Sequence, residues 1–128
     1  MSKKLLITDD ALIIREMIKN AVIEDGWEVV GEACNGQEAI DKYIELKPDL
    51  VTLDLVMPES DGLCALQGIM EFDKNANVVV VSAIEQDTVL KKAFKMGATD
   101  FIVKPFSKRG LLATLQKSFE NKEPAGVG

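Results

Sequence analysis

The stretch VTLDLVMP, residues 51–58, places one carboxylate, Asp54, in an otherwise almost wholly apolar run. The residues just before it, 50–53, form a short and nearly continuous hydrophobic run, which is typical of a parallel strand covered on both faces by helices. An ionised carboxylate beside such a strand needs a compensating partner, because burying an unpaired charge is very unfavourable. Asp54 is therefore a candidate functional residue.

Four other short apolar runs recur at a regular spacing along the chain. They occupy residues 5–7, 29–30, 78–81 and 101–103. Helix-like segments lie between them, with apolar residues at i, i+3, i+4 and i+7, as in Ile14, Met17, Ile18 and Ala21. This alternation predicts a doubly wound α/β fold, (βα)5, built on a five-stranded open parallel sheet with right-handed crossovers.

Cap and turn residues agree with these boundaries. Asn35 followed by Glu38 has the pattern of a capping box at the start of the second helix. Gly26 and Gly97 suit the positions just after helix ends. Glutamates on both sides of the run 29–30 favour an edge position for the second strand.

The composition fits a single domain, since 128 residues with 47% hydrophobic side chains can bury a real core. We place the domain at residues 1–122 and a flexible C-terminal tail at 123–128. No apolar stretch approaches the ~18 residues of a membrane span, and the start of the chain lacks a signal-peptide hydrophobic region. We therefore expect a cytoplasmic protein without membrane contact. The net charge of −6 argues against direct nucleic-acid binding.

The chain contains no histidine and two cysteines, Cys34 and Cys64. This composition excludes the usual Cys/His zinc sites, Ser-His-Asp and Cys-His catalysis, and any histidine general base within the chain. We predict that both cysteines are reduced and buried, because a free cysteine commonly packs as a small hydrophobic residue.

Polar side chains follow four of the five predicted strands. They are Asp9 and Asp10 after the first strand, Asp54 after the third, Ser82 at the end of the fourth, and Lys104 after the fifth. Because ligands bind outside the carboxyl ends of the strands in an open parallel sheet, these side chains are expected at one site.

Three carboxylates at one site repel one another, by about 4 kcal/mol for unit charges ~4 Å apart at an effective dielectric of about 20. Either one or more of them is protonated, or a hard cation lies among them, and Mg²⁺ suits such oxygen ligands. Lys104 can pair with Asp54 and hold a phosphoryl oxygen, while Ser82 can donate to another. In that setting the Asp54 carboxylate can act as a nucleophile towards phosphorus.

These residues lie in motifs that resemble the receiver domain of two-component response regulators, in particular the stand-alone CheY-like kind. The motifs are TDD (8–10), LDLVMPESDG (53–62), VVVVSA (78–83) and DFIVKPF (100–106), and the resemblance spans residues 3–120. It implies a flavodoxin-like fold with strand order 2-1-3-4-5, of which CheY is itself a standard example.

The resemblance also implies the chemistry of the site. Asp54 would be the phosphoacceptor, and Mg²⁺ would be held by Asp9, Asp10, Asp54 and the backbone carbonyl of Val56. Lys104 would contact the phosphoryl group.

Three further features follow from the same resemblance. Ser82 would also contact the phosphoryl group, and with Phe101 it would form the switch that reports phosphorylation. Because many relatives carry tyrosine in place of Phe101, a switch at this position must work through burial of the ring, without a hydroxyl hydrogen bond. The Lys104–Pro105 peptide bond is expected to be cis.

The predicted function is that of a response regulator receiver, a phosphoprotein switch without metabolic turnover. Because the chain has no histidine, the phosphoryl donor must be external, either a histidine kinase or a histidine phosphotransfer protein. Phosphorylation would change the surface formed by the helix before residues 101–103, that strand and the last helix, and a downstream protein target would bind there. The lysines of the two helices form either a basic partner-binding face or ordinary solvated surface: Lys91, Lys92, Lys95, Lys108 and Lys117. Chemotaxis, a phosphorelay and a receiver excised from a longer regulator all remain open.

The alternative function is a haloacid-dehalogenase-like, Mg²⁺-dependent phosphatase, which also uses an aspartate nucleophile. Such an enzyme normally needs a second aspartate two residues after the nucleophile, where this chain has Val56.

Val56 and Ile84 are expected to flank the phosphoryl group, and neither side chain can hydrogen-bond an attacking water. We therefore predict a long-lived aspartyl phosphate.

Overall fold

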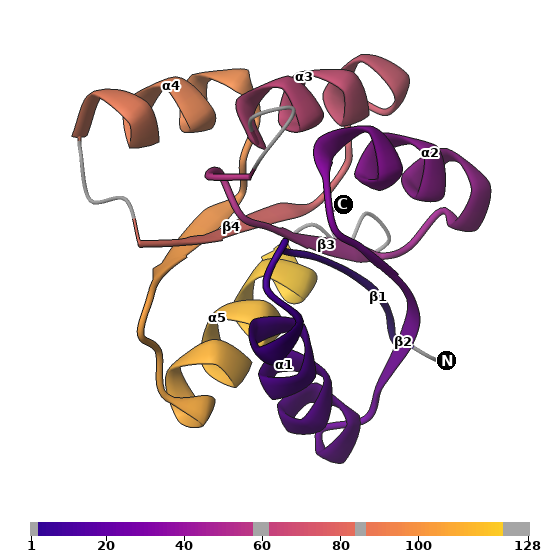
Figure 1. The fold of residues 1–128 in the computed structure, drawn as a ribbon, viewed down its shortest axis with the longest axis vertical. Coiled ribbons are helices and arrows are strands. Elements are labelled where there is room, and N and C mark those ends of the chain that lie inside the picture. Colours follow the sequence, from indigo (N-terminus) through magenta and orange to yellow (C-terminus); the bar gives the residue numbers. More distant parts are fainter. Residues whose placement is uncertain (1–2, 58–61, 84–86, 122–128) are drawn as a thin grey trace.

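The computed structural model describes residues 3–57, 62–83 and 87–121, in which one parallel sheet is covered by helices on both faces (Figure 1). The five strands are β1 (Lys3–Thr8), β2 (Trp27–Ala33), β3 (Leu50–Leu53), β4 (Val78–Ser82) and β5 (Asp100–Val103). They lie in the order β2-β1-β3-β4-β5, and every neighbouring pair is parallel. The predicted fold class and strand order are confirmed, including the edge position of β2.

The helices alternate with the strands along the chain. They are α1 (Leu12–Glu24), α2 (Gly36–Leu46), α3 (Gly62–Phe72), α4 (Asp87–Met96) and α5 (Lys108–Asn121). Figure 1 shows α1 and α5 on one face of the sheet and α2, α3 and α4 on the other. This arrangement leaves the carboxyl ends of the strands open between the two helical layers, which is where this fold class binds ligands.

Two hydrophobic clusters explain why the strand sequences are continuous and not alternating. On β1, Leu5 and Ile7 pack into the cluster under α1 and α5, whereas Leu6 packs into the cluster under α2, α3 and α4. The valines of β4 divide in the same way, with Val79 and Val81 on one side and Val78 and Val80 on the other. Because successive side chains of a strand point to opposite faces, covering both faces requires an apolar residue at each position.

The predicted caps are present. The Asn35 side chain accepts a hydrogen bond from the Glu38 amide at 2.9 Å. The Glu38 carboxylate accepts one from the Cys34 amide at 2.9 Å, one residue earlier than in a standard capping box. Gly26 and Gly97 have φ angles of +89° and +118°, which only glycine adopts easily.

Two details of the sequence interpretation are wrong. Met17 is 47% exposed, because the buried face of α1 is formed by Ile18, Ala21 and Val22, and Met17 lies beyond the edge of that face. Cys34 and Cys64 are both thiols, as expected, but both are exposed and not buried. Among the described residues, no helix is long and apolar enough to cross a membrane. The predicted tail and Ile84 lie outside the described residues.

Candidate functional site

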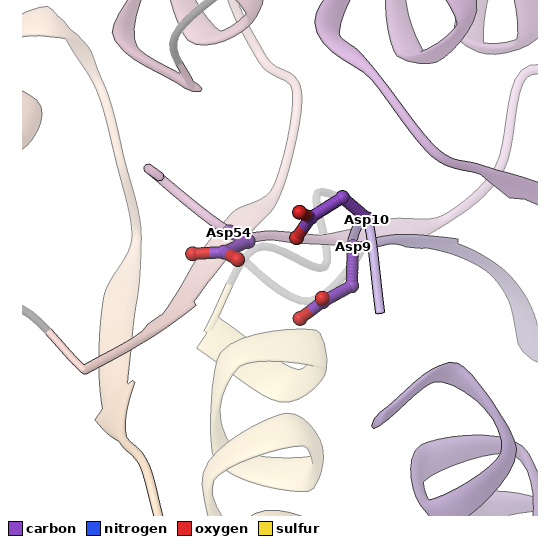
Figure 2. Close-up of side chains that lie close together, drawn as sticks. All are labelled: Asp9, Asp10 and Asp54. Carbon is purple, nitrogen blue, oxygen red and sulfur yellow. The ribbon is translucent and has the colours of Figure 1, made fainter. Parts of the chain in front are cut away.

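Three carboxylates come together at the carboxyl edge of the sheet. Asp9 and Asp10 follow β1 and Asp54 follows β3, and Figure 2 shows their side chains gathered in one place. One carboxylate oxygen from each of the three lies within 4.8 Å of the other two. Asp9 is 1% exposed and Asp54 is 4% exposed, whereas Asp10 is exposed. Adjacent parallel strands thus bring together acids that are more than 40 residues apart in the sequence.

Lys104 lies between two of these acids. Its Nζ atom is 2.7 Å from Oδ2 of Asp9 and 3.3 Å from Oδ2 of Asp54. The sequence interpretation paired Lys104 with Asp54 alone, whereas the shorter contact is to Asp9. The peptide bond from Lys104 to Pro105 is cis, as expected.

The buried acid and the lysine influence each other's protonation. Burial raises the pKa of Asp54, and the negative charge of Asp9 raises it further. The Val56 amide and the Lys104 ammonium only partly offset this, so the net pKa lies above the ordinary value. Burial alone would lower the pKa of Lys104, but its contacts with Asp9 and Asp54 outweigh burial and raise it. Lys104 therefore stays charged at neutral pH.

Backbone contacts fix the two buried acids in place. The Asp9 amide donates to the Ala33 carbonyl at 3.0 Å, and Oδ1 of Asp9 accepts from the Ala11 amide at 2.9 Å. The Asp54 amide donates to the Thr8 carbonyl at 3.1 Å, and Oδ1 of Asp54 accepts from the Val56 amide at 3.1 Å. Both carboxylates are thus oriented before any ligand arrives.

Gly62, the first residue of α3, makes a close approach that sequence reasoning missed. A Cβ atom at this position would lie 2.3 Å from the Asp54 carbonyl oxygen and 2.4 Å from Cα of Leu55. The Gly62 amide also donates to the Leu55 carbonyl at 3.0 Å. Nothing in the sequence distinguishes a glycine needed for close packing from one tolerated at a helix start.

The two predicted switch residues occupy different places. Ser82 is buried at the carboxyl end of β4, and its carbonyl accepts a hydrogen bond from the Lys104 amide at 3.0 Å. Phe101 lies further back on β5, paired in register with Val80. Its ring packs edge-on against Phe94 of α4, with 6.0 Å between ring centroids. Phe94, which sequence reasoning did not single out, therefore connects β5 to α4.

The donor set fits a hard divalent cation. The three carboxylates offer oxygen atoms close enough to bind one ion, and Mg²⁺ prefers oxygen ligands. Asp10 is exposed to solvent, which leaves room for the water molecules that Mg²⁺ usually retains. The role of the Val56 carbonyl stays a prediction, and the Val56 side chain is 56% exposed beside the cluster.

Comparison with known proteins gives concordant results. The sequence matches the response regulator receiver domain family over residues 5–116. It is 54% identical to the chemotaxis protein CheY of Listeria monocytogenes over 115 residues, covering 90% of this chain and 97% of that one. It is 49% identical to the chemotaxis protein CheY of Thermotoga maritima over 117 residues, covering 91% and 98%. The crystal structure of a CheX-CheY-BeF3-Mg²⁺ complex from Borrelia burgdorferi contains a similar chain, with a TM-score of 0.88, 36% identity, and coverage of 91% of this chain and 88% of that one.

Proposed function

The chain belongs to the response regulator receiver domain family, and from this we propose that it is a CheY-like switch that accepts a phosphoryl group on Asp54 in a Mg²⁺-dependent reaction. The observation that carries the proposal is the convergence of Asp9, Asp10 and Asp54 around the Lys104 ammonium at the carboxyl edge of the sheet. Burying charged side chains from separate strands together has a desolvation cost. Such clusters of interacting titratable groups occur preferentially at functional sites.

In the proposed reaction, a carboxylate oxygen of Asp54 attacks the phosphorus of a phosphohistidine on the donor protein. The new oxygen–phosphorus bond forms as the phosphorus–nitrogen bond breaks, and the imidazole leaves with its electron pair and takes up a proton from solvent. The Val56 amide holds the second oxygen of Asp54, so that the carboxylate is already oriented for attack.

Other residues of the site would stabilise the transferred group. We propose that Asp9, Asp10, Asp54 and the Val56 carbonyl hold Mg²⁺, which would supply positive charge to the phosphoryl oxygens. Lys104 would hold one phosphoryl oxygen through its ammonium group.

Phosphorylation of the buried site would change the conformation of the surface formed by α4, β5 and α5. Ser82 would hold a phosphoryl oxygen at the end of β4, and Phe101 would change its packing against Phe94 of α4. Phe94 is 41% exposed, so a change in its packing against Phe101 would alter the surface that a downstream protein contacts. The lysines of α4 and α5 are exposed, and those that face a bound protein would suit acidic side chains on it.

The proposed role is that of a signalling switch and not a metabolic enzyme. The haloacid-dehalogenase-like alternative finds no support, because the family match covers residues 5–116 and the position two residues after Asp54 is Val56. Since similar proteins from Listeria and Thermotoga are named chemotaxis proteins, we propose a chemotaxis pathway in the cytoplasm, with a histidine kinase or phosphotransfer protein as donor.

A phosphotransfer screen tests this function. The chain is incubated with each radiolabelled histidine kinase of the source cell and Mg²⁺, with Asp54→Ala as the control. Rapid transfer of label from one kinase to the native chain but not to the variant is expected. Equal labelling of the two proteins, or repeated release of phosphate from small phosphate esters, would contradict the proposal.

A further inference from the structure

Arg15 of α1 reaches back to the loop that carries the acids after β1. Its Nη1 atom donates to the backbone carbonyl of Asp9 at 2.7 Å, and its Nε atom lies 3.0 Å from Oε1 of Glu32 at the end of β2. The Arg15 side chain is only 16% exposed. The planar guanidinium thus joins two elements at once, which a lysine cannot do with the same geometry.

The carbonyl that Arg15 holds belongs to the peptide unit between Asp9 and Asp10. Because a peptide unit is planar, fixing its oxygen fixes the direction in which the chain leaves toward Asp10. The Asp9 side chain has its own contacts, to Ala11 and Lys104. The Asp10 carboxylate makes no hydrogen bond or ion pair with any residue that the structure describes, so its position depends on the backbone.

Glu32 holds Arg15 in this orientation. Its second oxygen, Oε2, lies 3.2 Å from Nζ of Lys19, so the carboxylate pairs with a cation on each side. The next residue, Ala33, accepts the hydrogen bond from the Asp9 amide. The strand that anchors Arg15 is therefore the same strand that anchors Asp9.

We propose that Arg15 is a positioning residue for the cation site, which sets the affinity for Mg²⁺ by orienting the Asp9–Asp10 peptide without touching the ion. The inference rests on the proposed function, because it presupposes that Asp9 and Asp10 hold Mg²⁺. Glu32 supports it by pairing with the guanidinium, which keeps that charge from turning toward the Asp10 carboxylate.

The sign of the effect distinguishes positioning from simple electrostatics. Removing a positive charge near an acidic site should tighten cation binding if charge alone matters. Removing a group that orients a metal-binding carboxylate should instead weaken cation binding. Lys19 offers a matched control, because it carries the same charge and contacts the same Glu32, and none of its described contacts is with Asp9.

The test is a titration of the ¹⁵N-labelled full chain with MgCl2, followed through the backbone amide signals near Asp10 and Asp54. We expect Arg15→Met to raise the Kd by about fivefold to tenfold, the equivalent of one ordinary hydrogen bond. Arg15→Lys should recover part of the affinity, since an ammonium can still donate to the Asp9 carbonyl. Lys19→Met should match the native chain or bind slightly more tightly.

A Kd for Arg15→Met equal to or below the native value overturns the inference. Should the spectrum show that Arg15→Met is unfolded, Arg15→Lys and Arg15→Gln replace it, and a native Kd in both has the same meaning. If the proposed function itself is wrong, the backbone amide signals of the native chain will not shift when Mg²⁺ is added. That result would also rule out a role for Arg15 in Mg²⁺ binding.

Discussion

The ammonium group of Lys104 lies 2.7 Å from the carboxylate of Asp9, although 95 residues separate them in the sequence. The same nitrogen is 3.3 Å from Asp54, so one cation balances two buried acids. This arrangement lowers the repulsion that three carboxylates would otherwise feel, and it means that Lys104 and a divalent ion act on the same group of acids.

Replacing Lys104 by Met is predicted to have opposite effects on two properties. Without the ammonium, the acids attract a dication more strongly, so the Kd for Mg²⁺ should fall by about tenfold. Labelling of Asp54 by a phosphoryl donor should nevertheless slow by at least about tenfold, because the phosphoryl oxygens lose a charged partner. Calorimetric titration and a labelling time course measure the two effects. Weaker Mg²⁺ binding in the variant would contradict this account of Lys104.

Gly62→Ala is predicted to destabilise the protein by about 2–4 kcal/mol, because the new methyl group would overlap the backbone of Asp54 and Leu55. Gly110→Ala is the matched control, since its Cβ would meet only the Ser107 hydroxyl, at 3.0 Å, and alanine favours the helix. The control should change the free energy of unfolding by less than about 1 kcal/mol. Urea denaturation compares the two, and equal stabilities would show that the close approach at Gly62 has no energetic consequence.

The ion pairs of Glu32 should make stability depend on pH. Burial tends to raise the pKa of Glu32, but hydrogen bonds from Lys19 and Arg15 and the attraction of their charges outweigh it, so the net pKa is lowered. A carboxyl group with a lowered folded-state pKa stabilises the fold above its unfolded pKa, and this contribution is lost as the pH falls through the folded value.

Glu32→Gln should therefore cost about 0.5–1 kcal/mol at neutral pH, in the range of surface ion pairs, and this cost should shrink as the pH falls through the lowered folded-state pKa. Glu28→Gln on the same strand is the control, because Glu28 is exposed and makes no ion pair with any described residue. A cost for Glu32→Gln that is as large at about pH 3 as at neutral pH would contradict the ion-pair explanation.

The aspartyl phosphate is predicted to be long-lived, because the exposed Val56 side chain cannot orient a water molecule. Replacing Val56 by Asn together with Ile84 by Glu should speed dephosphorylation by about tenfold, the equivalent of one good hydrogen bond to the attacking water. Val56→Leu provides a size control that should leave the rate unchanged. Decay of the labelled protein after removal of the donor gives the rate, and an unchanged rate in the double variant would refute the prediction.

The fold was predictable because burial on both faces leaves a strong pattern in the sequence. Continuous apolar runs such as 78–81 mark strands between two helical layers, and residues directly after them, such as Asp54 and Lys104, must lie at one edge. The order of the strands came from the resemblance to a family, since the pattern alone does not say which strands are neighbours.

Other features depend on geometry that no local pattern records. Met17 has helical spacing but lies beyond the buried face of α1, because that face follows Ile18 and Val22. The contact of Arg15 with the Asp9 carbonyl and the packing of Phe94 on Phe101 join residues from different elements. Such contacts follow from how α1 and α4 sit on the sheet, which the sequence of either helix does not state.

Mass spectrometry of the intact chain after incubation with acetyl phosphate shows whether Asp54 accepts a phosphoryl group in a Mg²⁺-dependent reaction. In the presence of MgCl2, we expect the addition of one phosphoryl group, mapped to Asp54, with little addition when the metal is chelated and none in Asp54→Ala. An unmodified Asp54 despite added Mg²⁺, or equal modification of the Asp54→Ala variant, would contradict this expectation.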